Sequence, residues 1–142
     1  MKKTVAILAA SAALSAGAVA LPTAAQAATI QGQAVRYTFC SDNQFGNDLT
    51  YYDSYGLVEL RNVTLPRNVG GARFCGTVET SQESGTYLWS HIRNYNSPYV
   101  YAAIDDVYFP PFAGSTGEPP SYRLIARSQD YSNYGYASAM AM

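Results

Sequence analysis

The chain has 142 residues, and the first 27 are typical of an export signal, which leaves 115 residues for a single folded domain. After residue 27 there are seven arginines, ten acidic residues and no lysine, so the net charge of this part is −3. Binding to nucleic acid or to an anionic membrane needs clustered positive charge. The scattered arginines therefore exclude both as expected partners.

Residues 1–27 have the three parts of a cleavable signal peptide. Lys2 and Lys3 supply the positive start, residues 4–21 form an alanine-rich apolar stretch, and residues 25–27 give an A-x-A cleavage motif. A retained membrane anchor is the alternative, because about 18 apolar residues almost span a bilayer. Alanine is only weakly apolar and no basic cluster follows, so we expect cleavage, secretion and no later insertion into a membrane.

Cys40 and Cys75 are the only two cysteines. An even number of cysteines in an exported chain predicts a disulfide, which by the chain-entropy model stabilises the fold by about 3 to 4 kcal/mol. Cys40 alternates in phase with Arg36 and Thr38, so we expect the bond at a sheet rim or on an outer face. A free catalytic cysteine is the weaker alternative in an oxidising compartment.

The mature chain has strand-like alternation and no sustained helical stripe. The expected strand segments are 35–39, 49–52, 57–60, 63–65, 72–80, 86–93, 99–104, 107–109 and 122–127. Asp105 and Asp106 are expected to form a two-residue hairpin turn, and the proline-rich stretch 110–120 an irregular connection. Residues 129–142 are expected to be an edge strand or a tail. The pattern predicts one all-β domain over residues 28–142, a small antiparallel immunoglobulin-like β-sandwich of about seven strands with one disulfide.

Two segments resemble a known family. Residues 49–56, with the sequence LTYYDSYG, are followed by VTLP at 63–66, and this pair is similar to the signature ITY-x-(D/N)-x-x-G … V-x-LPW of the MmpS (mycobacterial membrane protein small) family of actinobacterial exported proteins. Residues 85–88 with Asn94, and then residues 100–108, resemble the later strands of that family and its I-x-V-D-G hairpin. The resemblance implies an immunoglobulin-like sandwich without catalytic residues, whose anchored members assist lipid or siderophore exporters.

The chain departs from that signature at three points. Arg67 stands where the family has tryptophan, Asp106 stands where it has glycine, and a cleavable leader replaces the retained anchor. We therefore carry over the fold that the resemblance implies but not the role at a transporter.

Residues 28–142 hold 19 aromatic rings, 13 of them tyrosines. A domain this small cannot bury so many, so several tyrosines are expected to face water. Rigid amphipathic rings suit contacts with proteins or with the apolar faces of sugars, although tyrosine is also a common strand former on wet faces. The candidate binding residues are Tyr51, Tyr52, Tyr55, Tyr95, Tyr99, Tyr101, Tyr131 and Tyr134, and Tyr136 closes the last of these runs.

No catalytic residues are expected. His91 is the only histidine, and Ser90 beside it on a strand points to the opposite face, so the pair cannot form a hydrolytic site. A partly buried histidine beside Trp89 is the simpler interpretation. With both thiols paired, too few ligands remain for zinc, and no cofactor is expected.

Two oxygen-rich groups are candidates for calcium. The first is Asp42, Asn43, Asn47 and Asp48, which lacks the spacing of a preset calcium loop. The second is Asp105 or Asp106 with Glu118. Adjacent aspartates in a tight turn cannot straddle a glycosidic bond, so a glycosidase pair is not expected there.

Three functions fit these observations. The first is a secreted non-catalytic module that binds an exported or cell-envelope protein through a tyrosine-rich face or a sheet edge. The second is a module that binds carbohydrate or wall glycan with the same tyrosines. The third is a small hydrolase or a protease inhibitor, for which residues 110–120 would supply the exposed loop.

Overall fold

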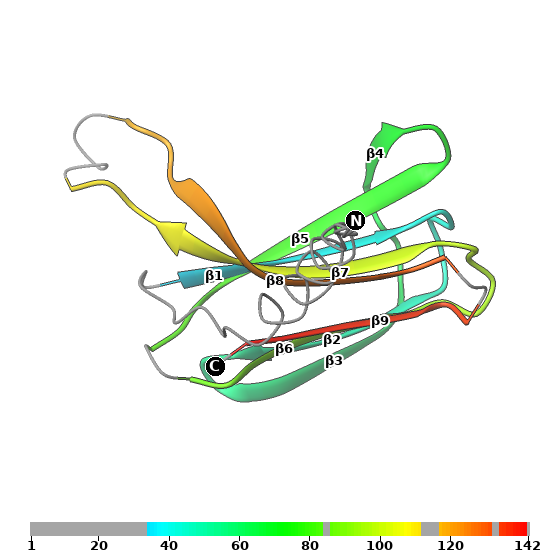
Figure 1. Cartoon of the computed structure of the whole chain (residues 1–142), viewed down its shortest axis with the longest axis horizontal. Coiled ribbons are helices and arrows are strands. Elements are labelled where there is room, and N and C mark those ends of the chain that lie inside the picture. The colour runs from blue at the N-terminus through cyan, green and yellow to red at the C-terminus, as the bar shows by residue number, and fades with distance from the viewer. Residues whose placement is uncertain (1–33, 84–85, 112–116, 132–133, 142) are drawn as a thin grey trace, which may run out of the picture.

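The domain is a sandwich of two antiparallel sheets (Figure 1). A computed structural model describes residues 34–83, 86–111, 117–131 and 134–141, so the expected leader at 1–27 lies outside the described residues. Sheet A has the strand order β4-β5-β1-β7-β8 and sheet B the order β3-β2-β6-β9. The strands are β1 (Ala34–Ser41), β2 (Asn47–Asp53), β3 (Gly56–Val63), β4 (Arg67–Gly70), β5 (Arg73–Ser81), β6 (Leu88–Arg93), β7 (Val100–Tyr108), β8 (Ser121–Asp130) and β9 (Tyr136–Ala141).

The prediction of an all-β antiparallel sandwich with one disulfide is confirmed, with nine described strands instead of about seven. Strands β1 to β6 have the Greek-key order of immunoglobulin strands B, C, C′, D, E and F. β7 lies beside β1, where an immunoglobulin has strand A, and β9 lies beside β6, where it has strand G. β8 then adds a fifth strand to sheet A.

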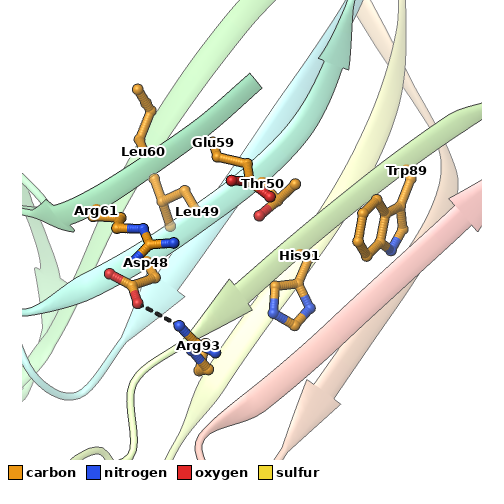
Figure 2. Close-up of a pocket in the computed structure, with 9 residues that line it drawn as sticks. All are labelled: Asp48, Leu49, Thr50, Glu59, Leu60, Arg61, Trp89, His91 and Arg93. Atoms are coloured by element: carbon orange, nitrogen blue, oxygen red, sulfur yellow. Dashed lines mark hydrogen bonds and ion pairs between the residues drawn. The ribbon is translucent and has the colours of Figure 1, made fainter. Parts of the chain in front are cut away.

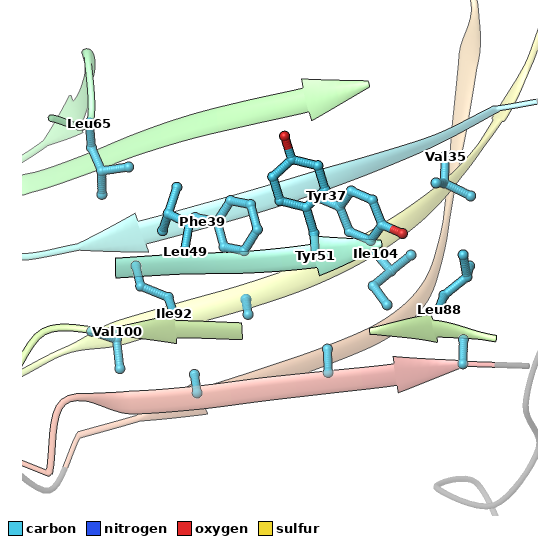
Figure 3. Close-up of a cluster of buried hydrophobic side chains, with 14 residues drawn as sticks. Val35, Tyr37, Phe39, Leu49, Tyr51, Leu65, Leu88, Ile92, Val100 and Ile104 are labelled. Atoms are coloured by element: carbon cyan, nitrogen blue, oxygen red, sulfur yellow. The ribbon is translucent and has the colours of Figure 1, made fainter. Parts of the chain in front are cut away.

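The core lies between the sheets and is built by the inward residues of each strand (Figure 3). Val35, Tyr37 and Phe39 alternate along β1 and are fully buried, as the period of two requires. They meet Leu49 and Tyr51 of β2, and the Tyr51 ring lies 5.3 Å from the Tyr37 ring. Truncating a buried ring of this kind typically costs about 3 to 5 kcal/mol.

Small residues close the sandwich at the β9 side. Ala137, Ala139 and Ala141 are the inward residues of β9, and all three are buried. Because alanine has so short a side chain, β9 packs closely against both β7 and β8 of the other sheet. The remaining residues of β9 therefore point outward, onto the outer face of sheet B.

The predicted hairpin turn at Asp105 and Asp106 is wrong, because β7 continues through both residues, with a register shift against β8 between Ile104 and Asp105. Asp105 lies opposite Arg36 of β1, and an Arg36 nitrogen is 3.2 Å from its carboxylate. Asp106 is 3% exposed and lies opposite Arg123 of β8. An Arg123 nitrogen is 3.0 Å from the Asp106 carboxylate. A cross-strand arginine neutralises each carboxylate, which is why two aspartates are tolerated inside a strand.

Candidate functional site

The outer face of sheet B carries an aromatic surface. Along β6, Leu88, Ser90 and Ile92 point into the core, so Trp89 and His91 point outward. Neighbouring strands and the segment before β6 extend the surface on both sides. We call this surface the platform, and it consists of Tyr52, Tyr87, Trp89, His91, Tyr136 and Met140.

Contacts between β6 and β9 fix the rings of the platform. The indole Nε1 of Trp89 donates a hydrogen bond of 2.6 Å to the Ser138 hydroxyl. His91 lies between two rings, with its centroid 5.7 Å from Trp89 and 4.6 Å from Tyr136. Tyr136 is 52% exposed and Met140 61% exposed, so the β9 side of the platform is open to solvent.

A shallow hollow of about 240 Å³ lies beside Trp89 (Figure 2). Its lining comes from β2, β3 and β6 and consists of Asp48, Leu49, Thr50, Glu59, Leu60, Arg61, Trp89, His91 and Arg93. Trp89, His91 and Arg93 follow one another along β6, and Asp48 and Thr50 of β2 lie opposite Arg93 and His91. The hollow therefore places one large ring beside a group of polar side chains.

Ion pairing organises the polar side of the hollow. An Arg93 nitrogen lies 2.8 Å from the Asp48 carboxylate, which also accepts a hydrogen bond from the backbone N–H of Asn62. The Arg93 contact, then the Asn62 hydrogen bond, lower the pKa of Asp48 below its ordinary value. Burial, and then Arg93, lower the pKa of His91. Its Nδ1 is buried and makes no hydrogen bond to any described residue.

The predicted tyrosines do not form one surface. Tyr55 at the β2–β3 turn is 97% exposed, and Tyr95 after β6 is 70% exposed. Tyr131 and Tyr134 lie between β8 and β9 and are also exposed. Of the eight candidates, Tyr52 alone belongs to the platform, where its ring lies 5.8 Å from that of Tyr87.

Two of the predicted tyrosines must be removed from the binding set because they are buried. Tyr51 is 8% exposed and packs in the core on Tyr37 and Phe39. Tyr99 is 6% exposed and lies under the guanidinium of Arg73, 3.6 Å from its ring centroid. In both cases neighbouring side chains cover a ring that we expected to be available for binding.

The disulfide is confirmed, and it lies on the outer face of sheet A. Cys40 and Cys75 are directly opposite on β1 and β5, with a Cα–Cα distance of 4.1 Å. The bond is covered by Tyr99, with Tyr101 packed against the same cluster. An immunoglobulin disulfide joins the two sheets, whereas this one joins neighbouring strands of one sheet.

An arginine also stacks on an aromatic ring elsewhere on sheet A. The Arg36 guanidinium carbon lies 3.5 Å from the ring centroid of Tyr122, and the Tyr122 hydroxyl donates to Glu79 at 3.0 Å. Together with the cover over the disulfide, these contacts leave the described rings at the centre of this face engaged. The platform on sheet B differs in degree, since Tyr87 and Tyr136 are 44% and 52% exposed, against 41% for Tyr122 and 6% for Tyr99.

The calcium candidates are not assembled into sites. Asp42 pairs with Arg73 at 3.3 Å and Asp48 pairs with Arg93, so the two carboxylates serve separate arginines. The side chain of Asn47 is buried and its amide donates to three backbone carbonyls, which makes it structural. No three of the described histidines, cysteines and acids are grouped closely enough to hold a metal ion.

The second calcium group fails for a different reason. Asp105 and Asp106 project from opposite faces of β7, and each pairs with its own arginine. Neither aspartate, with or without Glu118, belongs to a group of three described histidines, cysteines or acids that could hold a metal ion.

Ser90 and His91 lie on opposite faces of β6, as the sequence analysis required. Ser90 is fully buried among the inward residues, while His91 lies on the platform beside Trp89. The histidine is thus partly buried on an outer face. The loop 110–120, a candidate for inhibition, includes residues 112–116, which lie outside the described residues.

The platform includes residues that the sequence analysis did not select for binding. Tyr87, Trp89 and Met140 are among them, and the alternation of residues 86–93 was the signal that could have found the first two. That segment has bulky residues on both faces, a pattern that fits a strand with one face on the core and a second, aromatic face outside. Nothing in the sequence around Met140 indicated that it lies on this surface.

Comparison with known proteins gives no relative for this chain: no family model, no curated protein and no solved structure matches it. The resemblance to the MmpS family therefore stays a prediction. A search of the described residues also finds no helix long and apolar enough to cross a membrane.

Proposed function

We propose that this protein is a secreted, non-catalytic binding module that engages an exported or cell-envelope component through the platform on sheet B. The observation that carries the proposal is the contrast between the two outer faces. Rings at the centre of sheet A lie under arginines or cover the disulfide. On sheet B, Tyr87 and Tyr136 are exposed, and the partly exposed rings of Trp89 and His91 line a hollow.

The platform has the features of a recognition surface. Aromatic side chains dominate binding hot spots because they bury much area and lose little rotamer entropy. Trp89 is held in place by Ser138 before any ligand arrives, which lowers the entropic cost of binding. The opposite orientations of Ser90 and His91 support a module without catalysis.

Binding to an isolated cell-envelope fraction of the producing organism tests the proposal. We expect the purified protein to cosediment with this fraction and the Trp89→Ala variant to lose about tenfold or more in affinity. Tyr55→Ala is the matched control, because Tyr55 is exposed at a turn and lies outside the platform. Equal retention of the Trp89→Ala variant and the wild type would reject the platform as the binding surface.

Two ligand classes fit the sequence of such a module, a protein partner and a glycan. A sheet edge was the other expected binding mode for a protein. β9 is the edge strand of sheet B in its hydrogen-bonded order, but it packs closely on β7 and β8. The described surface therefore favours a face over that edge.

A further inference from the structure

We propose that the hollow beside Trp89 binds one sugar ring of a neutral glycan. This inference rests on the proposed function, since it names the ligand of the same platform. The sugar's apolar face would lie against the indole, and its hydroxyls would bond to Asp48, Arg93 and Glu59.

The lining combines one large ring with many hydrogen-bonding groups. Besides Trp89 and His91 it includes two carboxylates, two guanidiniums and the Thr50 hydroxyl. The cores of protein–protein interfaces are depleted of aspartate and glutamate, because burying them against another protein is costly. A sugar ring has one apolar face and a rim of hydroxyls that can satisfy both partners of an ion pair. This lining therefore favours a sugar over a protein side chain.

The charges of the hollow cancel. Asp48 and Glu59 balance Arg61 and Arg93, so the lining has no excess of either sign. Burial, and then Arg93, lower the pKa of His91, which favours its neutral imidazole. A phosphorylated or acidic ligand would find no net attraction, whereas an uncharged ligand needs none. The balance thus specifies a neutral glycan.

The polar groups are oriented in advance and remain accessible. The side chains of Arg93 and Asp48 are 40% and 32% exposed while they are bonded to each other. A guanidinium has five N–H donors and a carboxylate can accept several hydrogen bonds, so both keep capacity for hydroxyls. At about 240 Å³ the hollow is smaller than the pockets of drug-sized ligands, which suits a single ring.

The first arm of the test uses soluble, protein-free neutral polysaccharides: a glucan, a mannan and a galactan. We expect at least one of them to retard the purified protein in affinity electrophoresis. Trp89→Ala and Asp48→Asn should each weaken that retardation by about tenfold or more, and Tyr55→Ala should leave it unchanged. Circular dichroism checks that each variant is folded. Retardation by none of the three, or retardation unaffected by Trp89→Ala, overturns the inference.

The second arm separates failure of this inference from failure of the proposed function. The cell-envelope fraction is offered either after proteinase digestion or after periodate oxidation, which cleaves sugar diols. A glycan ligand survives proteinase and is lost on oxidation. Loss on proteinase alone, with binding still dependent on Trp89, overturns the glycan and keeps the binding module. Binding independent of Trp89 overturns both.

Discussion

The Trp89 indole and the Ser138 hydroxyl are joined across β6 and β9 by a hydrogen bond of 2.6 Å. Ser138 lies opposite His91 in the strand register, so the bond runs diagonally between neighbouring positions on the outer face. It orients the only tryptophan of the chain at the rim of the hollow. The position of the indole thus depends on β9, a strand that is distant from Trp89 in the sequence.

Removing that hydroxyl should weaken ligand binding without disturbing the fold. A single hydrogen bond contributes about 0.5 to 1.5 kcal/mol, so we expect Ser138→Ala to lower affinity for the envelope fraction about twofold to tenfold. Tryptophan fluorescence should change in the same variant, because the indole loses its acceptor. Ser121→Ala, on sheet A, is the control and should change neither. Unchanged fluorescence in Ser138→Ala would show that the bond does not orient the ring.

Gly135 should be intolerant of any side chain. A Cβ at this position would lie 1.9 Å from the Asn94 carbonyl oxygen, and the backbone has a φ of 61°. Gly71 has nearly the same φ of 59° but nothing within 4 Å of a built Cβ. We expect Gly71→Ala to cost about 1 to 2 kcal/mol, from the left-handed conformation alone. Gly135→Ala should cost about 2 kcal/mol more, from the clash.

Urea denaturation of the two glycine variants measures this difference in the free energy of unfolding. The comparison isolates the steric part, because both variants carry the same conformational penalty. Equal losses in the two variants would mean that the chain around Asn94 relaxes around the methyl group.

The sequence predicted the architecture better than the site, for physical reasons. Val35, Tyr37 and Phe39 alternate cleanly because one face of β1 is core, so the strand was visible in one dimension. The disulfide could also be predicted, because an even number of cysteines in an exported chain suggests a pair. Asp105 and Asp106 misled the prediction because Arg36 and Arg123, distant in sequence, neutralise them inside a strand.

The tyrosine-rich sequence did not predict which rings form the platform, for a similar reason. Whether a ring is free depends on what lies over it, and the cover comes from distant residues such as Arg73 over Tyr99. The composition could say that some rings face water, but not which. The platform needed the pairing of β6 with β9, which only the fold supplies.

The disulfide should stabilise the domain and resist reduction. Replacing both Cys40 and Cys75 by alanine should lower the free energy of unfolding by about 3 to 4 kcal/mol in the chain-entropy model. The two cysteines are less than one-tenth exposed and pack in one buried cluster with Tyr99. We therefore expect dithiothreitol to reduce the bond slowly in the native protein and quickly in urea, as measured by thiol titration. Tyr99→Ala should speed native reduction, and a rate unaffected by that change would show that the ring does not shield the bond.

His91 should make stability depend on pH just below neutrality. Burial, and then Arg93, lower its pKa from the ordinary value of 6.5, while Asp48 opposes the shift. As the pH falls below 6.5, the unfolded chain therefore takes up a proton before the folded protein does, and the free energy of unfolding decreases. Well above 6.5 both states are neutral and the contribution is constant. The chain has no other histidine. The pKa of Asp48 is lowered from 3.8, so the change of stability with pH that Asp48 causes lies mainly below pH 5. Urea titrations across this range should show the decrease in the wild type and a flatter profile in His91→Gln; identical slopes would place the titrating group elsewhere.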